Sequence, residues 1–372
     1  MKVPYLDLKV TNKNHSKILL KRFKKILDHG RIIEGPEVKD FENKISNYLQ
    51  SKYAVGLSSG SSALFLALQS LNIGPGSEVI TTPFTWIITI NSIIANGAKP
   101  VFADINDDLN INPNSIIKLI NKRTKAIVPM HVGGHMCDME LISKIAKDYN
   151  LEIIEDAAQA ICGSLNGKKA GSWSKISAFS MNPMKMLNAY GECGVATTSS
   201  KNLYKKLLSL RHAGTKKDIR KIDINRCYDV SLNHKIDTLQ ASFLIENLKN
   251  LPKKQKSRDK ISKLYDLELN NIIDAPQYYN KEIHGRYLYI FTCNKRDKLY
   301  LFLKNYNIES KIFYSPLALD APVFKNKFSK AIIPNARRQI KRSLAIPMHE
   351  NMSMQQVEYV INKIKKFYKE GY

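Results

Sequence analysis

The chain lacks the cysteine pattern of a disulfide-stabilised or zinc-binding protein. Its five cysteines are an odd number, and no two of them stand in a CxxC spacing, which argues against a disulfide framework and a zinc site. A long apolar run is also absent, because the most apolar segment, Trp86 to Ala95, is interrupted by polar residues and too short to span a bilayer. The N-terminus shows no stretch of signal-peptide length. We therefore expect a cytoplasmic protein without a membrane partner.

Acidic residues are scarce, with 33 Asp and Glu against 58 Lys and Arg, which gives a net charge of +25. Such an excess is compatible with nucleic acid, an acidic surface or a phosphorylated small substrate as partner, and equally with a lysine-rich proteome, which we favour. The basic residues are spread along the chain, and no helix-turn-helix, zinc-finger or aromatic-basic RNA-binding pattern accompanies them. We therefore expect no nucleic-acid partner.

Short apolar runs alternate with helical patterns between residues 50 and 200, which predicts an α/β fold with a mostly parallel seven-stranded sheet between helices. The sequence pattern changes near residue 250, where Leu251-Pro252 is expected to end a helix. We expect a large domain at 1–248 and a smaller α+β domain at 249–372. The expected strands of the large domain are Tyr53–Leu57, Glu78–Thr82, Pro100–Ala103, Ala126–Met130, Glu152–Glu155, Lys175–Ser180 and Gly194–Thr198.

A lysine and a carboxylate follow two of these expected strands. Lys185 comes after the strand that ends at Ser180, where a buried amine could attack an aldehyde. Taken alone, Lys185 fits better as a surface lysine of a lysine-rich protein. Asp156 stands at the carboxyl end of an apolar run, where ligands of open α/β sheets gather. Its carboxylate could pair with a protonated pyridine nitrogen, or cap a helix, or do both.

Small hydroxyl residues and an aromatic residue complete the set. The stretch with Gly60, Ser61 and Ser62 follows a strand and opens a helix, so its backbone N–H groups could seat a phosphate, with Ser180 adding a hydroxyl. An ordinary serine cap stays open as the alternative. Trp86 could stack on a flat ring, although core packing is the commoner fate of such a residue. Together the segments supply the amine, carboxylate, phosphate cradle and stacking ring that pyridoxal phosphate needs.

These segments resemble, in their order and spacing, the DegT/DnrJ/EryC1/StrS sugar aminotransferases of fold type I. The similarity runs from Glu34-Gly35-Pro36 through the serine stretch, Glu155-Asp156-Ala157-Ala158-Gln159 and the lysine loop to the region between Tyr228 and Ser242. The resemblance implies a fold type I transferase with pyridoxal 5'-phosphate as cofactor and Lys185 as the catalytic, Schiff-base lysine that also moves a proton. It implies these cofactor-binding residues: Gly60, Ser61, Ser62, Trp86, Asp156, Gln159, Ser180, Lys185 and Asn233.

Some of these roles are more specific. In the family, the residue matched by Gln159 lies against the cofactor ring, and the residue matched by Asn233 reaches the phosphate of the neighbouring subunit. The resemblance therefore implies a homodimer with a shared active site. The sequence departs from the family pattern at Met181, Cys193 and Lys235, and it lacks the histidine that many members carry near 314–319. These departures leave the residues of the cofactor chemistry unchanged, but they leave the identity of the substrate open.

The resemblance implies transfer of an amino group from an amino acid, expected to be L-glutamate, to a keto-sugar linked to dTDP, UDP or GDP. Such a reaction serves amino-sugar and surface-polysaccharide biosynthesis. Three alternatives stay open. The first is the same chemistry on another ketone such as a keto-cyclitol. The second is a sugar dehydratase, although the dehydratases of the family replace the lysine by histidine. The third is a pyridoxal-phosphate-binding regulator without turnover, which the combination of Lys185, Asp156 and Gln159 disfavours.

Overall fold

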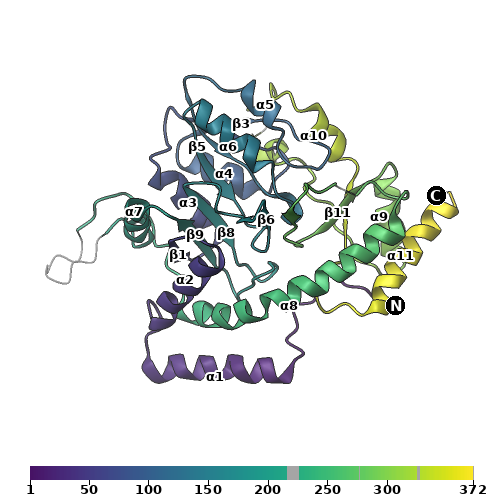
Figure 1. The fold of residues 1–372 in the computed structure, drawn as a ribbon, viewed down its shortest axis with the longest axis horizontal. Coiled ribbons are helices and arrows are strands. Elements are labelled where there is room, and N and C mark those ends of the chain that lie inside the picture. The colour runs from purple at the N-terminus through teal and green to yellow at the C-terminus, as the bar shows by residue number, and fades with distance from the viewer. Residues whose placement is uncertain (216–225, 276, 325–326, 372) are drawn as a thin grey trace.

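A seven-stranded sheet forms the centre of the larger part of the molecule (Figure 1). The computed structural model describes residues 1–215, 226–275, 277–324 and 327–371. Only β9 runs antiparallel to its neighbours in this sheet, so the predicted mostly parallel sheet is confirmed, and each of the seven predicted strands is present. In order across the sheet, the strands are β1 (Tyr53–Leu57), β9 (Gly194–Thr198), β8 (Ile176–Ser180), β5 (Glu152–Asp156), β4 (Thr124–Val128), β2 (Glu78–Thr81) and β3 (Lys99–Phe102).

Helices cover both faces of the sheet, and most of its strands are therefore buried on both sides. One hydrophobic cluster joins the sheet to α3 (Gly60–Ser70), α4 (Ile87–Ala95) and α7 (Lys201–Arg211). A second cluster joins the opposite face to α2, α5, α6 and the first half of α8. The bounds of these and the outer N-terminal helix are α1 (Lys13–His29), α2 (Pro36–Tyr48), α5 (Pro113–Ile117), α6 (Met139–Asp148) and α8 (Thr238–Leu269).

Helix α8 connects the two parts of the molecule and crosses Figure 1 from below the large sheet to the C-terminal elements. The prediction that a helix ends at Leu251-Pro252 was wrong, since α8 continues through Pro252. A proline inside a helix removes one backbone hydrogen bond, but this helix is held by packing on either side of it. Leu251 is buried in the core of the large sheet, and Tyr265 is buried in a separate C-terminal cluster. The division at 248/249 stays a proposal.

The C-terminal cluster packs helices and the end of α8 against a two-stranded antiparallel sheet. No helix of the described residues is both long and apolar enough to cross a bilayer. The remaining elements are β6 (Ser164–Leu165), β7 (Lys168–Lys169), β10 (Glu282–Ile283), β11 (Tyr289–Thr292), β12 (Ser343–Ile346), α9 (Arg296–Asn305), α10 (Pro334–Gln339), α11 (Met354–Lys369) and the 3₁₀ turns η1 (Val132–Gly134), η2 (Ala318–Asp320) and η3 (Pro322–Phe324).

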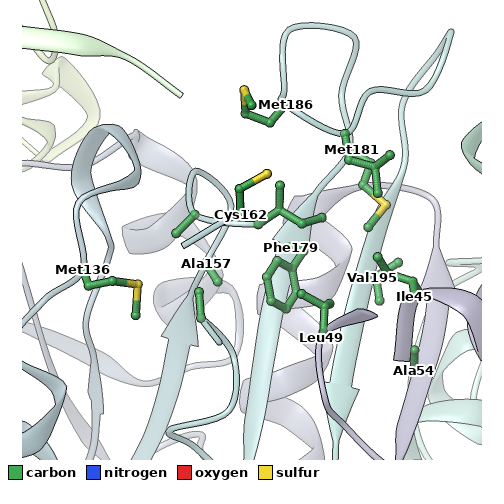
Figure 2. Packing of buried hydrophobic residues seen from close by; sticks show 14 of the residues in the cluster. Ile45, Leu49, Ala54, Met136, Ala157, Cys162, Phe179, Met181, Met186 and Val195 are labelled. Carbon is green, nitrogen blue, oxygen red and sulfur yellow. The ribbon is translucent and has the colours of Figure 1, made fainter. Parts of the chain in front are cut away.

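The loop that follows β8 is anchored by its apolar side chains. Figure 2 shows Phe179 in the middle of the core, with Met181 beside Val195 and Met186 farther along the loop, below the top of its arch. Side chains alternate between the two faces of a strand, so Phe179 and Met181 enter the core while Ser180 points to the other face. Met181 is fully buried and Met186 is 2% exposed. The position of the lysine loop is therefore fixed by hydrophobic packing.

A buried ionic cluster ties the loop after β4 to the C-terminal part of the chain. His135 contacts Asp108 at 3.2 Å through Nε2 and Glu282 at 2.9 Å through Nδ1. Burial alone would lower the pKa of His135, but the hydrogen bonds and charges of the two carboxylates outweigh it and raise the pKa to about 9. His135 is therefore charged in the folded protein at neutral pH.

This cluster makes the stability depend on pH. Because the pKa of His135 in the folded protein lies above its ordinary value of 6.5, its contribution is fully present below pH 6.5 and is lost as the pH rises through about 9. We expect the difference in free energy of unfolding between the wild type and His135→Gln to shrink by about 3 kcal/mol over this interval. Urea unfolding of both proteins between pH 6 and 10 measures it. A constant difference would show that folding does not raise the pKa of His135.

Candidate active site

Six parallel strands end at the same edge of the large sheet, and the loops that follow five of them enclose a cavity of about 550 Å³. Ligands of open α/β sheets bind at this edge because the loops and helix N-termini converge there. The small domain closes the cavity with aromatic side chains. The lining residues are Ser59, Gly60, Ser61, Leu64, Trp86, Ile88, Thr89, Met130, Asp156, Ala158, Gln159, Ala178, Ser180, Asn182, Met184, Lys185, Glu192, Tyr287, Phe313 and Tyr314.

Asp156, the last residue of β5, places a buried carboxylate in this cavity. One carboxylate oxygen accepts a hydrogen bond from Thr89 Oγ1 at 2.8 Å and the other accepts from the backbone N–H of Ala158 at 3.2 Å. No described lysine, arginine or histidine forms an ion pair with it. Burial raises the pKa of Asp156, and the two hydrogen bonds and the charge of Lys185 offset only part of this effect. A cationic ligand in the cavity would stabilise this carboxylate.

The N-terminus of α3 lies unusually close to β8 and β9. A Cβ atom on Gly60 would lie 2.6 Å from the Cβ of Ser180, and one on Gly194 would lie 2.2 Å from the carbonyl oxygen of Ser59. Only glycine fits at these two positions. The approach places the hydroxyl of Ser180 beside the first turn of α3, where the backbone N–H groups of Gly60 and Ser61 have no hydrogen-bond partner among the described residues. Free N–H groups at a helix N-terminus bind anions such as phosphate.

Lys185 enters the cavity from the loop after β8. The backbone N–H of Lys185 donates to the carbonyl of Asn182 at 2.9 Å, and the Asn182 side chain accepts from the N–H of Met184 at 3.0 Å, so a tight turn presents the lysine. Its Nζ atom lies 4.4 Å from the centre of the Tyr287 ring. A cation over the face of an aromatic ring is stabilised by the negative charge of that face. Tyr287 therefore holds the amine of Lys185 inside the cavity.

Gln159 is fixed by both ends of its amide. Its oxygen accepts a hydrogen bond from the backbone N–H of Gly133 at 2.7 Å, and its nitrogen donates to the hydroxyl of Tyr314. The side chain is 5% exposed, and Tyr314 comes from a loop of the small domain. This pair therefore connects the edge of the sheet with the small domain across the cavity.

Seven of the nine predicted cofactor-binding residues line the cavity, and two do not. Trp86 lies at its rim and is 61% exposed, so a flat face is available for stacking. The hydroxyl of Ser62 instead contacts those of Ser58 and Ser59 and the ring of His234. Asn233 is exposed on the surface, with its side-chain oxygen accepting from the backbone N–H of Lys235 at 3.3 Å. Within one chain, Ser62 and Asn233 therefore do not reach the cavity.

Sequence reasoning missed several lining residues. Thr89 lies three residues after Trp86 and so on the same side of α4, but a single threonine within an apolar run does not indicate a hydrogen bond to Asp156. Tyr287, Phe313 and Tyr314 follow Lys185 by more than a hundred residues in the chain, and no local pattern connects them with the lysine. Hydroxyl donors to a buried carboxylate and aromatic side chains from another domain become visible only in three dimensions.

The residues present fit pyridoxal phosphate. The carboxylate of Asp156 lacks a cationic partner and matches a protonated pyridine nitrogen, and the first turn of α3 with Ser180 matches a phosphate. Lys185 supplies the amine that an aldehyde requires, between these two features. The cavity thus provides each of the contacts that the cofactor needs.

A model of the DegT/DnrJ/EryC1/StrS aminotransferase family matches residues 14–365. The chain belongs to this family. It is 35% identical to the pleiotropic regulatory protein of Geobacillus stearothermophilus, with 99% of each chain covered, and 33% identical to the dTDP-3-amino-3,6-dideoxy-alpha-D-galactopyranose transaminase of Aneurinibacillus thermoaerophilus, with 98% of this chain and 99% of that protein covered. The X-ray structure of S. venezuelae DesV in complex with a ketimine intermediate matches with a TM-score of 0.94 at 29% identity, covering 98% of each chain.

Family membership confirms the predicted fold type and the predicted chemistry. The chain is a transaminase that uses pyridoxal phosphate. The departures at Met181 and Cys193 do not alter this, because both side chains are fully buried in the core and neither lines the cavity.

Thr89 should support cofactor binding through Asp156. The Thr89 hydroxyl donates its one proton to the carboxylate, so the hydroxyl of Thr85, at 2.8 Å, must donate to Thr89. We expect Thr89→Val to weaken pyridoxal phosphate binding about tenfold, since a hydrogen bond to a charged group is lost. An absorbance titration of the apoprotein with the cofactor measures the change.

Thr81→Val is the matched control. The Thr81 hydroxyl is equally buried and also donates at 2.8 Å, but to the carbonyl of Val128 away from the cavity. This variant should lose stability while keeping the cofactor affinity of the wild type. Equal losses of affinity in the two variants would mean that Thr89 acts only through stability.

Proposed function

We propose that this aminotransferase moves an amino group from an amino acid, L-glutamate, to a nucleotide-linked keto-sugar (dTDP-, UDP- or GDP-linked), in the cytoplasm, for amino-sugar and surface-polysaccharide biosynthesis. The observation that carries the proposal is the cavity around Lys185 and Asp156 in a chain similar over its whole length to a dTDP-sugar transaminase. The spore coat polysaccharide biosynthesis protein SpsC of Bacillus subtilis, 35% identical, supports the same assignment.

Each proposed role follows from a position in the cavity. Pyridoxal phosphate, when bound, supplies an aldehyde that takes up the amino group and a ring that accepts electrons. Asp156 keeps the pyridine nitrogen protonated, because its buried carboxylate is stabilised by that positive charge. Nζ of Lys185 removes the α-proton of the donor and returns a proton on the acceptor side. Trp86 and Gln159 keep the ring in place, and Gly60, Ser61 and Ser180 hold the phosphate.

We further propose a homodimer in which Asn233 of one chain completes the phosphate site of its partner. Asn233 is exposed and cannot serve its own cavity, since it does not line it. The residues around it are apolar and exposed: Val230 is 91% exposed and Leu232 is 67% exposed. Exposed apolar side chains next to a polar residue are typical of a surface that a second chain covers. The homodimer would bury this surface.

An assay of amine transfer tests the proposed function. Purified protein loaded with pyridoxal phosphate is mixed with glutamate and a panel of dTDP-, UDP- and GDP-linked keto-sugars, and 2-oxoglutarate and amino-sugar are measured. We expect turnover with at least one keto-sugar. Lys185→Ala should abolish it and remove the visible absorbance of the lysine-bound cofactor, because no other described lysine lines the cavity.

Lys175→Ala is the control, since Lys175 precedes the same strand β8 at its opposite end and its side chain is 63% exposed. It should behave as the wild type. Turnover by Lys185→Ala would assign the reaction to another lysine, and a normal cofactor spectrum without turnover on any keto-sugar would contradict the proposed substrate.

Mixed dimers test the shared site. Lys185→Ala inactivates one chain, and Asn233→Asp places a negative charge where the phosphate of the partner is expected. If each site uses Lys185 of one chain and Asn233 of the other, a mixed dimer contains one intact site. Random pairing then restores about a quarter of the wild-type activity. Activity no higher than the mean of the two parent variants would show that Asn233 does not act across an interface.

The similarity to a pleiotropic regulatory protein favours a second function, regulation without turnover. Regulation by cofactor binding alone would not require a lysine that moves a proton. The intact Lys185, held over Tyr287 inside the cavity, therefore supports the enzymatic function over the regulatory one.

A further inference from the structure

A buried histidine, His234, lies behind the phosphate cradle, which consists of the first turn of α3 and the hydroxyl of Ser180. The residue is 8% exposed, and the centre of its ring lies 5.8 Å from that of Phe65 on α3. Its backbone is also held, because its N–H donates to the carbonyl of Arg211 at 3.0 Å and its carbonyl accepts from the N–H of Ser58 at 2.9 Å. His234 is therefore fixed beside the start of α3.

A chain of side-chain contacts runs from His234 to the residue that caps α3. Nδ1 of His234 lies 3.0 Å from the hydroxyl oxygen of Ser62. That hydroxyl lies 2.9 Å from the hydroxyl of Ser58 and 3.1 Å from the hydroxyl of Ser59. Ser59 is the N-cap of α3, and its hydroxyl accepts a hydrogen bond from the backbone N–H of Ser62 at 3.0 Å. Ser62 therefore connects His234 with the cap.

The Ser62 hydroxyl has enough hydrogen-bonding capacity for all three of these neighbours. Burial lowers the pKa of His234, so its ring is uncharged at neutral pH, and Nδ1 either donates to Ser62 or accepts from it. A hydroxyl has one proton and two lone pairs, which match the three contacts. Removing the nitrogen of His234 would leave this buried hydroxyl without one of its partners.

The cap determines which backbone N–H groups of α3 are available to an anion. The hydroxyl of an N-cap serine can accept from the second or the third N–H of its helix. In α3 the third belongs to Ser62, which is the one used, and the second belongs to Ser61, which lines the cavity. If the Ser59 side chain turned to Ser61, it would occupy one of the N–H groups that a phosphate needs. The contact with the Ser62 hydroxyl stabilises the orientation that leaves Ser61 free.

We propose that His234 is a positioning residue for the cofactor phosphate and that it acts through Ser62. The contact between these two side chains holds the Ser59 cap on the third N–H of α3 and keeps the first two free. The inference rests on the proposed function, because it takes the first turn of α3 as the phosphate site. It also gives Ser62 a role behind the cradle, although its side chain does not reach the cavity.

Titration of the apoprotein with pyridoxal phosphate and with pyridoxal, which lacks the phosphate, tests this role without any substrate. We expect His234→Leu to raise the dissociation constant for pyridoxal phosphate about fivefold, because the Ser62 hydroxyl loses a partner and no longer holds the cap. The dissociation constant for pyridoxal should stay unchanged. His234→Asn should restore most of the affinity, since its amide branches at the same carbon as Nδ1 and can donate or accept.

The route through Ser62 is tested by combining two variants. Ser62→Ala alone should raise the dissociation constant for pyridoxal phosphate by about the same factor as His234→Leu. The double variant should then bind the cofactor no more weakly than either single variant, because both changes break the same contact. Losses that multiply in the double variant would show that His234 acts independently of Ser62 and would overturn the proposal.

His349→Leu is the matched control, since His349 is also buried, at 2% exposed, and does not line the cofactor cavity. It should lose stability in urea unfolding and keep the cofactor affinity of the wild type. Equal losses of affinity in His234→Leu and His349→Leu would reduce the role of His234 to stability. An unchanged affinity in His234→Leu, or an equal loss for pyridoxal and pyridoxal phosphate, would also overturn the proposal.

The outcome is separate from that of the keto-sugar panel, because no substrate takes part in the titration. A panel without turnover would contradict the proposed substrate and leave the role of His234 standing. A wild type that binds pyridoxal as tightly as pyridoxal phosphate would contradict the phosphate site at α3, and the proposal for His234 with it.

Discussion

The close contact between the first turn of α3 and the end of β8 is the constraint on which the rest of the active site depends. Gly60 and Gly194 have no space for a side chain there, so the helix N-terminus and the strand end meet at the distance of backbone packing. The hydroxyl of Ser180 is fixed by this contact, and Lys185 follows it by five residues on a loop whose apolar side chains are held in the core. The phosphate cradle and the reactive amine are therefore positioned by one packing arrangement.

The two neighbouring carboxylates of β5 point to opposite sides of the strand, because side chains alternate along it. One of them therefore stabilises the structure and the other faces the cavity. Glu155 points away from the cavity and is fully satisfied by the backbone N–H groups of Gly171 and Trp173, with further contacts to Ser174 and His131. Asp156 points into the cavity and receives hydrogen bonds from only Thr89 and Ala158 among the described residues. The first carboxylate holds the loop after β7 against the sheet, whereas the second stays available for a ligand.

Much of the fold and of the cofactor site could be predicted because the signals are local. The seven strands are short apolar runs, and the residues after them reach the same edge of the sheet through parallel topology alone. Pro252 misled the prediction, since packing of Leu251 and Tyr265 into two cores outweighs the missing hydrogen bond of a proline. Tyr287 and Tyr314 could not be predicted, because their proximity to Lys185 and Gln159 results from docking of the small domain and leaves no pattern in the sequence.

The separation of core side chains from cavity side chains also explains why the departures from the family pattern at Met181 and Cys193 leave the cavity unchanged. Met181 and Cys193 lie in the core behind the cradle, where an apolar side chain of suitable size is sufficient. Changes that alter the substrate would lie outside this core, on surface side chains that meet the cavity from outside. The proposed cofactor contacts come from the ends of sheet strands, which cannot move without disturbing the core. Surface side chains around the mouth of the cavity can change one at a time without disturbing that core, so that one catalytic arrangement can serve many substrates.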